Sequence, residues 1–426
     1  MRCRLSASAS SWEYKPRFDM SENRNVPKLR FPEFKSVWDL PKLSEKMEIF
    51  RGASPRPKSD PLYYGGSIPR VLIEDVSRDG KYTTPKIDYL TEEGAKKSRL
   101  LPKGSVILSC SGTRVAIPGI LAVDACIHDG WLGFREFIEV ENEFLYYLFV
   151  KLHERMQGEA TTGGVFNNLT TSIIRDLRLG FPSHPEQQKI AEFLTAVDRR
   201  IELLQAKKEK LEAYKKGVMQ QIFTQKLRFK ADDGSDFPDW EEKKLGEVAK
   251  FSKGKGISKS DISKDGSQEC IRYGELYTEY AEVIDVVISR TELDQSGLVL
   301  SQANDVIIPS SGETQLDIAR ASCVLRSGIA LGGDLNIIRS TLNGVFLSFY
   351  LNHRRKHQIA KMAQGISVVH LYNSQLQELE IEIPFIDEQN KIAQFLTSLD
   401  GSIENLNQQI THTQTWKKGL LQKMFV

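Results

Sequence analysis

The chain has 426 residues, of which 40% are hydrophobic and 27% are charged, and its formal net charge at pH 7 is +2. A length of this order predicts two or more domains, because a single core rarely grows to that size. The mild positive charge does not by itself indicate nucleic-acid binding. No apolar run is long enough for a transmembrane helix, and the five cysteines are scattered without a CxxC pair. We therefore expect a cytoplasmic protein with no membrane partner and no bound metal.

Residues 1–25 differ in character from everything that follows. They are rich in serine and arginine, lack the apolar core of a signal peptide, and contain nothing that recurs later in the chain. We expect them to form a disordered N-terminal extension, with the working chain beginning near Met20.

Residues 26–182 predict a first mixed domain. The segment opens on an LRFP sequence followed by a tryptophan, and continues with short β-branched runs that Gly, Pro, Ser and Asp interrupt, a pattern typical of strands and turns. The run Val106–Leu108 leads into a Ser-Cys-Ser-Gly turn. A helix is expected at 142–157 and a strand at 177–182.

The next region, residues 183–226, predicts one long helix over 185–223. Its apolar positions step alternately by four and by three, which is the seam of a coiled coil rather than the wider apolar face of a single surface helix. The first positions of this seam are Ile190, Leu194, Val197, Ile201 and Leu204.

The whole arrangement then recurs. Residues 227–384 again open on an LRF sequence and a tryptophan, place a strand at Val306–Ile308, a helix at 347–363 and a strand at 379–384, and lead into a second long helix within 385–426. The helical stretches of the two halves align without a gap, whereas the middle segments diverge, so we interpret the chain as an internal repeat. The matching seam positions are Ile392, Leu396, Leu399, Ile403 and Leu406.

The order of elements determines how two such helices can pair. Because each domain precedes its own helix, pairing along the seams requires the helices to run antiparallel. The predicted fold is therefore α+β, with two pseudo-symmetric mixed α/β domains joined by a long antiparallel two-helix coiled coil. About 30 helical residues separate the two domains by roughly 45 Å. This separation is slightly more than the ~34 Å of one B-DNA turn. Gly217 and Gly419 occupy matching positions, where we expect each helix to break so that its tail packs on the opposite domain.

Short sequence motifs within the repeat point to a family. The helices begin EQQKIAEFL and EQNKIAQFL and end YKKGVMQQIF and WKKGLLQKMF. In these segments, and in the order of its elements from about Val26 onward, the chain resembles the specificity subunit of a type I restriction–modification system.

The resemblance implies a non-catalytic subunit with two target-recognition domains, each reading one half of a bipartite double-stranded DNA site. It implies that the helices set the spacer between the halves and dock two methyltransferase subunits, and that two restriction subunits complete the complex. The partners would use S-adenosylmethionine, ATP and Mg²⁺, and this chain would bind no cofactor.

The residues themselves agree with a subunit that lacks catalytic machinery. The sequence has no Pro-Pro for an adenine-gripping loop, no GxxxxGK[ST] phosphate loop and no GxSxG elbow. Two alternatives to a DNA-recognition subunit remain open, namely an enzyme in its own right and a coiled-coil scaffold without nucleic acid.

Candidate DNA contacts come from polar loops at matching places in the two halves. Arg114 suits guanine and Gln315 suits adenine, while lysines of the FSKGKG loop suit phosphates better than that loop suits a cofactor. For each residue the alternative is a structural turn. The candidates are Lys58, Arg78, Lys81, Tyr82, Ser111, Thr113, Arg114 and Asn167 in the first domain, and Lys253, Lys255, Ser310, Ser311, Thr314, Gln315 and His370 in the second.

Two helical features allow more than one interpretation. Phe193 and Phe395 lie beside the seam, where their rings either form part of a docking surface for the partner subunits or pack on their own domains. His353 and His357 have a zinc-like spacing, but the Arg-Arg-Lys between them favours a basic helix face instead.

Overall fold

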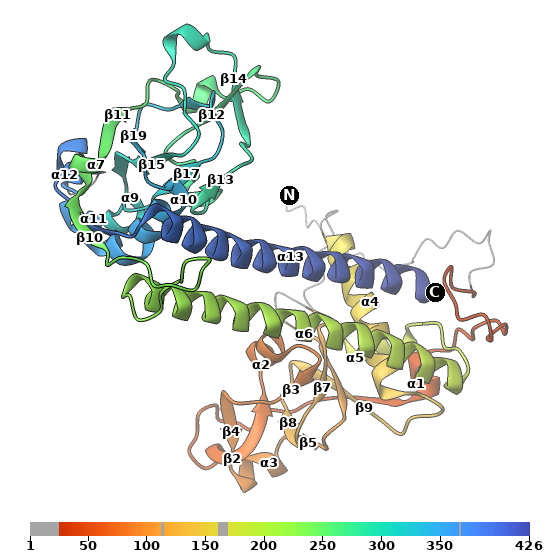
Figure 1. Ribbon diagram of the computed structural model, residues 1–426. Helices are drawn as coiled ribbons and strands as arrows, with labels where there is room; N and C mark the ends of the chain where they lie inside the picture. The colour runs from red at the N-terminus through yellow and green to blue at the C-terminus, as the bar shows by residue number, and fades with distance from the viewer. Residues whose placement is uncertain (1–24, 112–114, 161–168, 366–367) are drawn as a thin grey trace, which may run out of the picture. The chain divides into compact units, whose positions relative to one another are not determined.

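The computed structural model describes residues 25–111, 115–160, 169–365 and 368–426 (Figure 1). The chain divides into two compact units, unit 1 with residues Met1–Leu203 and Ile410–Val426, and unit 2 with residues Leu204–Gln409. Both boundaries fall inside the long helices. All but the last residue of the expected N-terminal extension lies outside the described residues, as do Thr113, Arg114 and Asn167.

Unit 1 is built on a five-stranded sheet with the order β1-β9-β6-β7-β3, beside a four-stranded sheet with the order β4-β2-β8-β5. Strand pairs are antiparallel except for β3 with β7 and β2 with β8. The strands are β1 (Glu48–Arg51), β2 (Tyr64–Val71), β3 (Tyr82–Thr83), β4 (Asp88–Leu90), β5 (Arg99–Leu101), β6 (Val106–Ser109), β7 (Pro118–Leu121), β8 (Ala125–Ile127) and β9 (Trp131–Arg135). The helices are α1 (Leu43–Lys46), α2 (Ile73–Asp79), α3 (Glu92–Lys96), α4 (Asn142–Ala160), α5 (Thr171–Asp176) and the first half of α6 (His184–Phe223).

Unit 2 repeats this plan, with a five-stranded sheet in the order β11-β19-β15-β17-β13 and smaller sheets β14-β12-β18, β10-β21 and β16-β20. Its strands are β10 (Glu241–Lys244), β11 (Ala249–Lys253), β12 (Gln268–Ile271), β13 (Val283–Ile284), β14 (Ser289–Thr291), β15 (Asp305–Pro309), β16 (Ser311–Gly312), β17 (Ser322–Val324), β18 (Ala330–Leu331), β19 (Leu335–Ser340), β20 (Val369–His370) and β21 (Glu380–Ile383). Its helices are α7 (Leu245–Val248), α8 (Glu275–Thr278), α9 (Gln315–Ile318), α10 (Gly344–Tyr350), α11 (Lys356–Met362), α12 (Asn373–Gln377) and the first part of α13 (Ile386–Met424), with the π-helix η3 (Leu351–Arg355) and the short 3₁₀ turns η1 (Lys259–Asp261) and η2 (Gln295–Gly297).

The two main sheets have the same strand order and the same pairing directions, including the parallel edge strand. The predicted α+β class with two pseudo-symmetric mixed domains is therefore confirmed. In each unit the central strand is wholly buried, and its side chains alternate between two clusters: Val106 and Leu108 enter one core and Ile107 the other. This alternation follows from the two-residue period of a strand.

The strand predicted at 177–182 is wrong for unit 1. There the chain forms only the isolated bridges Asp39↔Phe181 and Lys42↔Arg178, whereas the equivalent residues of unit 2 form the continuous pair β10·β21. Pro41 lies between the two bridges and has no N–H to donate, so the ladder cannot continue through it.

The expected helix breaks at Gly217 and Gly419 are also wrong, because α6 and α13 continue through both residues. A helical glycine costs only about 1 kcal/mol, and burial of the last turns offsets that cost. The expected packing of the tails does occur: Val218, Ile222 and Phe223 enter a core of unit 2, and Leu420, Leu421, Met424 and Phe425 enter a core of unit 1.

Each unit contains the beginning of one long helix and the end of the other. The two helical segments in a unit therefore run antiparallel, as the order of elements requires. The predicted seam faces inward throughout. Ile190, Leu194, Val197, Ile201, Ile392, Leu396 and Leu406 are buried, and Leu204, Leu399 and Ile403 are half-buried.

The remaining helices differ from expectation only in extent. The helix predicted at 142–157 continues to Ala160, and the one predicted at 347–363 begins at Gly344 and contains the π-helical turn η3. The side chain of Asn343 caps this second helix by accepting a hydrogen bond from the Phe346 N–H at 3.0 Å. Among the described residues, no helix is both long enough and apolar enough to cross a membrane.

Candidate nucleic-acid interface

In unit 2, loops distant in sequence meet at one surface. The turn after β15 pairs with the segment before α12, since β16 and β20 are antiparallel with Ser311 opposite His370. Two backbone hydrogen bonds fix the turn itself: Ser310 donates to Asp334 at 2.8 Å, and Leu371 donates to Ser310 at 3.0 Å. The turn after β15 and the loop before α12, which both carry candidate DNA contacts, are therefore neighbours.

The side chains that this surface exposes differ in chemistry. Gln315 and Thr314 are exposed at the start of α9, where Thr314 caps the helix by accepting from the Asp317 N–H at 3.1 Å. His370 and Tyr372 are exposed with ring centroids 6.4 Å apart. The Lys253 ammonium lies 5.9 Å from the centre of the Tyr372 ring, which brings the FSKGKG loop to the same place. We call these five residues the unit 2 loop surface.

The other candidates of unit 2 fall into two groups. Lys255 is exposed in the same loop as Lys253. Ser310 and Ser311 are buried, and the Ser311 carbonyl accepts a hydrogen bond from the Tyr277 hydroxyl at 2.8 Å. For these two serines the structure favours a role within the turn over contact with a ligand.

A tyrosine pair beneath this surface was not predicted. Tyr273 is exposed and lies edge-on to Tyr277, with ring centroids 6.1 Å apart. Burial raises the pKa of the Tyr277 phenol, which keeps it a hydrogen-bond donor to the turn. The sequence signal was the Tyr-Gly-Glu-Leu-Tyr spacing, which places Tyr277 in α8 and Tyr273 in the turn just before that helix.

Unit 1 holds its corresponding turn in the same way. Cys110 donates its N–H to the Gly130 carbonyl at 2.8 Å, and Leu169 donates to the Cys110 carbonyl at 2.8 Å. Ser111 follows and is half-buried. The segment after residue 168 thus returns to this turn just as its counterpart does in unit 2.

The loop that follows β1 is tied to the same place in unit 1. Arg51 Nε donates to the Asp129 carbonyl and Ser54 Oγ to the Asp129 carboxylate, each at 2.5 Å. The hydrogen bond from Ser54 lowers the pKa of Asp129, which therefore stays ionised. Arg56 and Lys58 remain exposed on the same loop, and the Arg56 guanidinium lies 3.7 Å from the Asp129 carboxylate. Lys58 is available to an anionic ligand.

Arg78 lies at the C-terminal end of α2 and is engaged inside the domain. Its guanidinium donates to Asp79 at 2.7 Å, to Asp75 at 3.0 Å and to the Thr84 carbonyl at 2.7 Å. The hydrogen bond from Arg78 lowers the pKa of Asp79 to about 2. For Arg78 the structure favours a structural role, because its donors already have partners.

Lys81 directly precedes β3 and is buried where this strand meets helices α4 and α6 of unit 1. Its ammonium donates to Glu143 at 3.1 Å, to the Tyr147 hydroxyl at 3.2 Å and to Thr195 at 2.7 Å. Tyr82 donates its hydroxyl to Glu143 as well. Burial lowers the pKa of Lys81 even though Glu143 favours the charged form.

The same polar group extends to the second long helix. Tyr147 donates to Asp198 at 2.7 Å, and Asp198 pairs with Lys417 of α13 at 2.5 Å. Expected as DNA contacts, Lys81 and Tyr82 instead join helices to a domain, and we infer a structural role for both. The group, which we call the junction cluster, consists of Lys81, Glu143, Tyr147, Thr195, Asp198 and Lys417.

A second network closes each domain onto the start of its long helix. Arg30 binds Glu186 through two hydrogen bonds of 2.7 Å, and Trp38 Nε1 donates to the same carboxylate at 3.2 Å. In unit 2, Arg228 and Trp240 bind Glu388 in the same manner, with Arg228 Nη2 at 2.7 Å and Trp240 Nε1 at 3.2 Å. We call these the helix-start clusters.

Neighbouring glutamines complete the helix-start contacts. Gln187 accepts from the Glu141 N–H at 3.0 Å, and Gln389 accepts from the Asn343 N–H at 2.9 Å. These roles were missed from the sequence. The available signal was the identical Glu-Gln pair that opens both helices.

The rings beside the seam are also accounted for. Phe193 lies edge-on to Phe31, and Phe395 to Phe229, both with ring centroids 5.7 Å apart. Of the two interpretations, packing on the opening segment of the same unit is the one observed. Trp416 contacts Phe193 at 5.9 Å but stays half exposed.

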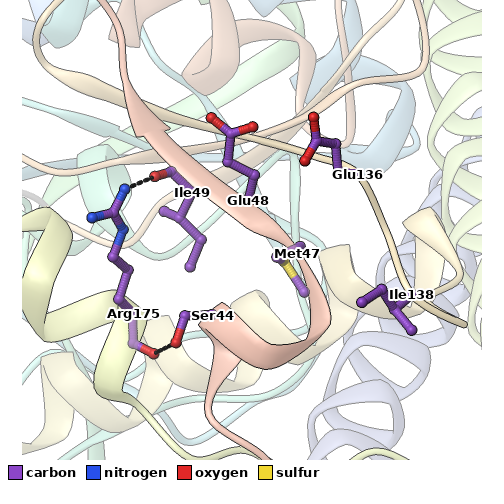
Figure 2. A pocket seen from close by; sticks show the side chains of 7 residues that line it. All are labelled: Ser44, Met47, Glu48, Ile49, Glu136, Ile138 and Arg175. Carbon is purple, nitrogen blue, oxygen red and sulfur yellow. Dashed lines mark hydrogen bonds between the residues drawn. The ribbon is translucent and has the colours of Figure 1, made fainter.

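A shallow pocket of about 420 Å³ lies beside β1 in unit 1 (Figure 2). Its polar groups bind one another, since Arg175 donates to the Ile49 carbonyl at 2.9 Å and Ser44 to the Arg175 carbonyl at 3.0 Å (Figure 2). None of the candidate DNA contacts lines this pocket.

The geometry defines a class of protein: one mixed domain built twice, each copy carrying an exposed loop surface, and each closed onto long paired helices by the same contacts. Residues 35–213 and 238–412 match the family described as the type I restriction modification DNA specificity domain. The chain belongs to this family and contains two copies of the domain, which confirms the resemblance found in the sequence.

The sequence match extends over most of the length of curated relatives. The chain is 26% identical to the type I restriction enzyme MjaIX specificity subunit of Methanocaldococcus jannaschii, covering 91% of this chain and 92% of that protein. It is 23% identical to the MjaVIII specificity subunit of the same organism, over 84% and 88% of the two chains.

Among solved structures, the S subunit from M. genitalium superposes with a TM-score of 0.54 at 14% identity, over 94% of this chain and 99% of that one. The HsdS subunit from Thermoanaerobacter tengcongensis gives a TM-score of 0.51 at 17% identity, over 92% and 98%. At these identities the likeness concerns the fold.

Proposed function

We propose that this chain is the non-catalytic DNA-recognition subunit of a type I restriction–modification complex, and that each unit reads one half of a bipartite double-stranded site. The observation that carries the proposal is the contrast between the repeated frame and the loops mounted on it. The helix-start clusters are the same in both units, whereas the loop at 251–259 carries Lys253 and Lys255 and its counterpart at 51–58 carries Arg56 and Lys58. Two different surfaces on one frame suit two different half-sites.

The chemistry of the loops fits this role. Gln315 can form paired hydrogen bonds with adenine once its amide nitrogen releases the Ala363 carbonyl, to which it donates at 3.4 Å, and exposed lysines suit phosphates. Arg114, Thr113 and Asn167 stay predictions for the first half-site, because they lie outside the described residues.

In this proposal the long helices set the spacer between the half-sites and dock two methyltransferase subunits. Exposed apolar side chains on the helices support docking, since Leu203, Tyr214 and Trp416 are each more than half exposed. Two restriction subunits complete the complex. S-adenosylmethionine, ATP and Mg²⁺ belong to these partners, which carry the catalytic steps.

The test uses the chain purified together with its methyltransferase. Methylation-sensitive long-read sequencing of the host genome first gives the motif. The complex should then methylate a duplex carrying both halves, and scrambling either half should abolish methylation. Methylation without sequence preference would overturn the proposal, as would a chain that binds no methyltransferase.

The coiled-coil scaffold without DNA is the competing proposal, and the mild net charge of +2 is its only support. Salt dependence separates the two proposals, because binding through phosphates weakens steeply as salt rises. A complex whose DNA affinity was independent of salt would favour the scaffold.

A further inference from the structure

We propose that two interhelical ion pairs, Asp198–Lys417 and Lys215–Asp400, fix the register of α6 against α13 and so determine which DNA spacer the protein accepts. The inference rests on the proposed function, because a spacer has meaning only if both units read DNA. It adds the residues that set the spacer. These four act as positioning residues and need not touch DNA.

Each pair joins one long helix to the other inside a single unit. Asp198 of α6 meets Lys417 of α13 at 2.5 Å in unit 1, and Lys215 of α6 meets Asp400 of α13 in unit 2. In the internal repeat Asp198 corresponds to Asp400, and Lys417 corresponds to Lys215. The same contact is therefore made twice with the helices exchanged.

Aromatic rings of the domains hold both lysines in place. The Lys417 ammonium lies 5.7 Å from the centre of the Tyr147 ring, and the Lys215 ammonium lies 4.9 Å from that of Phe349. Both rings belong to the helix that covers the main sheet, α4 in unit 1 and α10 in unit 2. Each lysine is thus fixed relative to its domain as well as to the facing helix.

An apolar seam does not by itself determine the register of two paired helices. Residues such as Val197 and Leu406 repeat by heptads, so a slip of one heptad replaces apolar contacts with similar ones. A half-buried charge behaves differently, because a slip leaves it without its partner and away from water. A slip would break the pair in each unit.

In unit 2 the energetics argue that the ion pair contributes specificity rather than stability. Burial raises the pKa of Asp400, although Lys215 acts in the opposite direction. Ionised Asp400 therefore costs more in the folded protein than in the unfolded chain. An ion pair that costs free energy in the folded protein is best explained by the other helix registers that it excludes.

The test uses charge reversal in unit 2, where the pair has no tyrosine hydroxyl attached to it. The variants are Lys215→Asp, Asp400→Lys and the double variant, each purified with the methyltransferase. The readout is methylation of duplexes whose half-sites stand at the native spacing or one to three base pairs closer or farther apart, because a slip of one heptad moves the helices by about 10 Å, roughly three base pairs of B-DNA. Lys208→Glu is the matched control, because the ion pair of Lys208 lies within α6, with Glu212 at 3.7 Å, and does not cross to α13.

Each single reversal should lower the preference for the native spacer by at least about tenfold, since two like charges then face each other. The double variant should restore the preference to within about twofold of wild type, because the pair re-forms with its charges exchanged. Lys208→Glu should leave the preference unchanged. An unchanged preference in the single variants, or no restoration in the double variant, would overturn the inference.

Two further results separate the possible failures. If the wild-type complex methylates all spacings equally, the proposed function itself fails. If a single reversal does not fold, Lys215→Met and Asp400→Asn replace it, and these should widen the accepted spacing without opposing like charges. Sharp spacing in both neutral variants would overturn the inference as well.

Discussion

Unit 1 and unit 2 share a frame but differ where the domain meets the helices. In unit 1 the junction cluster contains two cations and two carboxylates around Tyr147. In unit 2 the equivalent of Tyr147 is Phe349, the equivalent of Lys81 is Glu282, and a single ion pair remains between Lys215 and Asp400. The helix-start clusters, by contrast, are the same in both units.

This comparison distinguishes two kinds of buried contact, which have different roles. The repeated contacts close each domain onto its helix, and duplication has kept them because both copies need the same attachment. The contacts that differ connect the helices to the particular β-domain that each unit carries. Substitutions in the two classes should therefore behave differently in the two units.

The largest effect is expected from the helix-start clusters. Glu186→Ala and Glu388→Ala each leave an arginine and a tryptophan N–H without their buried acceptor, so each should destabilise its unit by about 3–5 kcal/mol. Urea unfolding of the whole chain measures this loss. The comparison predicts nearly equal losses for the two variants.

The matched controls are Glu186→Gln and Glu388→Gln, which keep an acceptor for the tryptophan but remove the charge. They should fall between wild type and the alanine variants. A large loss for one alanine variant with none for the other would contradict an identical role in the two units.

An intermediate effect is expected at the junction itself. Tyr147→Phe gives unit 1 the ring of unit 2 and removes a hydroxyl that donates to Asp198 and accepts from Lys81, which should cost about 1–2 kcal/mol. The reciprocal change Phe349→Tyr adds a hydroxyl beside Lys215 and Asp400, but Glu282 stands in the place of Lys81 there, so we expect no matching gain. Thermal unfolding of both variants checks the asymmetry. Equal and opposite shifts would show that the two junctions are equivalent.

The sequence predicted the elements that follow from periodicity and repetition. The heptad seam, the two long helices, the central strands and the duplicated frame were all readable, because burial imposes a regular spacing on apolar residues. The strand at 177–182 was misjudged because its partner contains Pro41, and the effect of a proline on a ladder depends on which segment pairs with it. The helix breaks at Gly217 and Gly419 were misjudged because packing outweighs the propensity of one residue.

The candidate site was only partly predictable. The positions of the turns could be predicted from the sequence, and the pairing of β16 with β20 agrees with them. The exposure of each polar residue could not be predicted, because it depends on tertiary contacts. Lys81 resembles an exposed turn lysine in sequence, but its partners Glu143 and Thr195 come from distant helices.

A smaller effect is expected on DNA binding from single exposed lysines. Lys255→Ala in unit 2 and Lys58→Ala in unit 1 should each weaken binding to all sequences alike and lower the salt slope by about one. Binding of the methyltransferase complex to its duplex, measured over a salt series, checks both. A residue whose loss instead changes the preferred base reads sequence, and a residue without effect lies away from DNA. Comparing the two variants shows whether the loops at 51–58 and 251–259 have matching roles.

The smallest effect is expected at acid pH, in the corner after α2. Arg78 holds the pKa of Asp79 at about 2, below the ordinary value of 3.8. A carboxylate with a lowered pKa in the folded state stabilises the protein above its unfolded pKa, and that stabilisation is lost as the pH falls from 3.8 towards 2. Asp79→Asn should therefore be less stable than wild type near pH 6, by no more than about 1 kcal/mol for this partly exposed pair, and the gap should narrow below pH 4 and close as the pH reaches about 2. Asparagine keeps an oxygen to accept from the Thr84 N–H, which Asp79 binds at 2.9 Å, so the variant isolates the charge. A gap that stayed constant across this range would assign the stabilisation to the hydrogen bond instead.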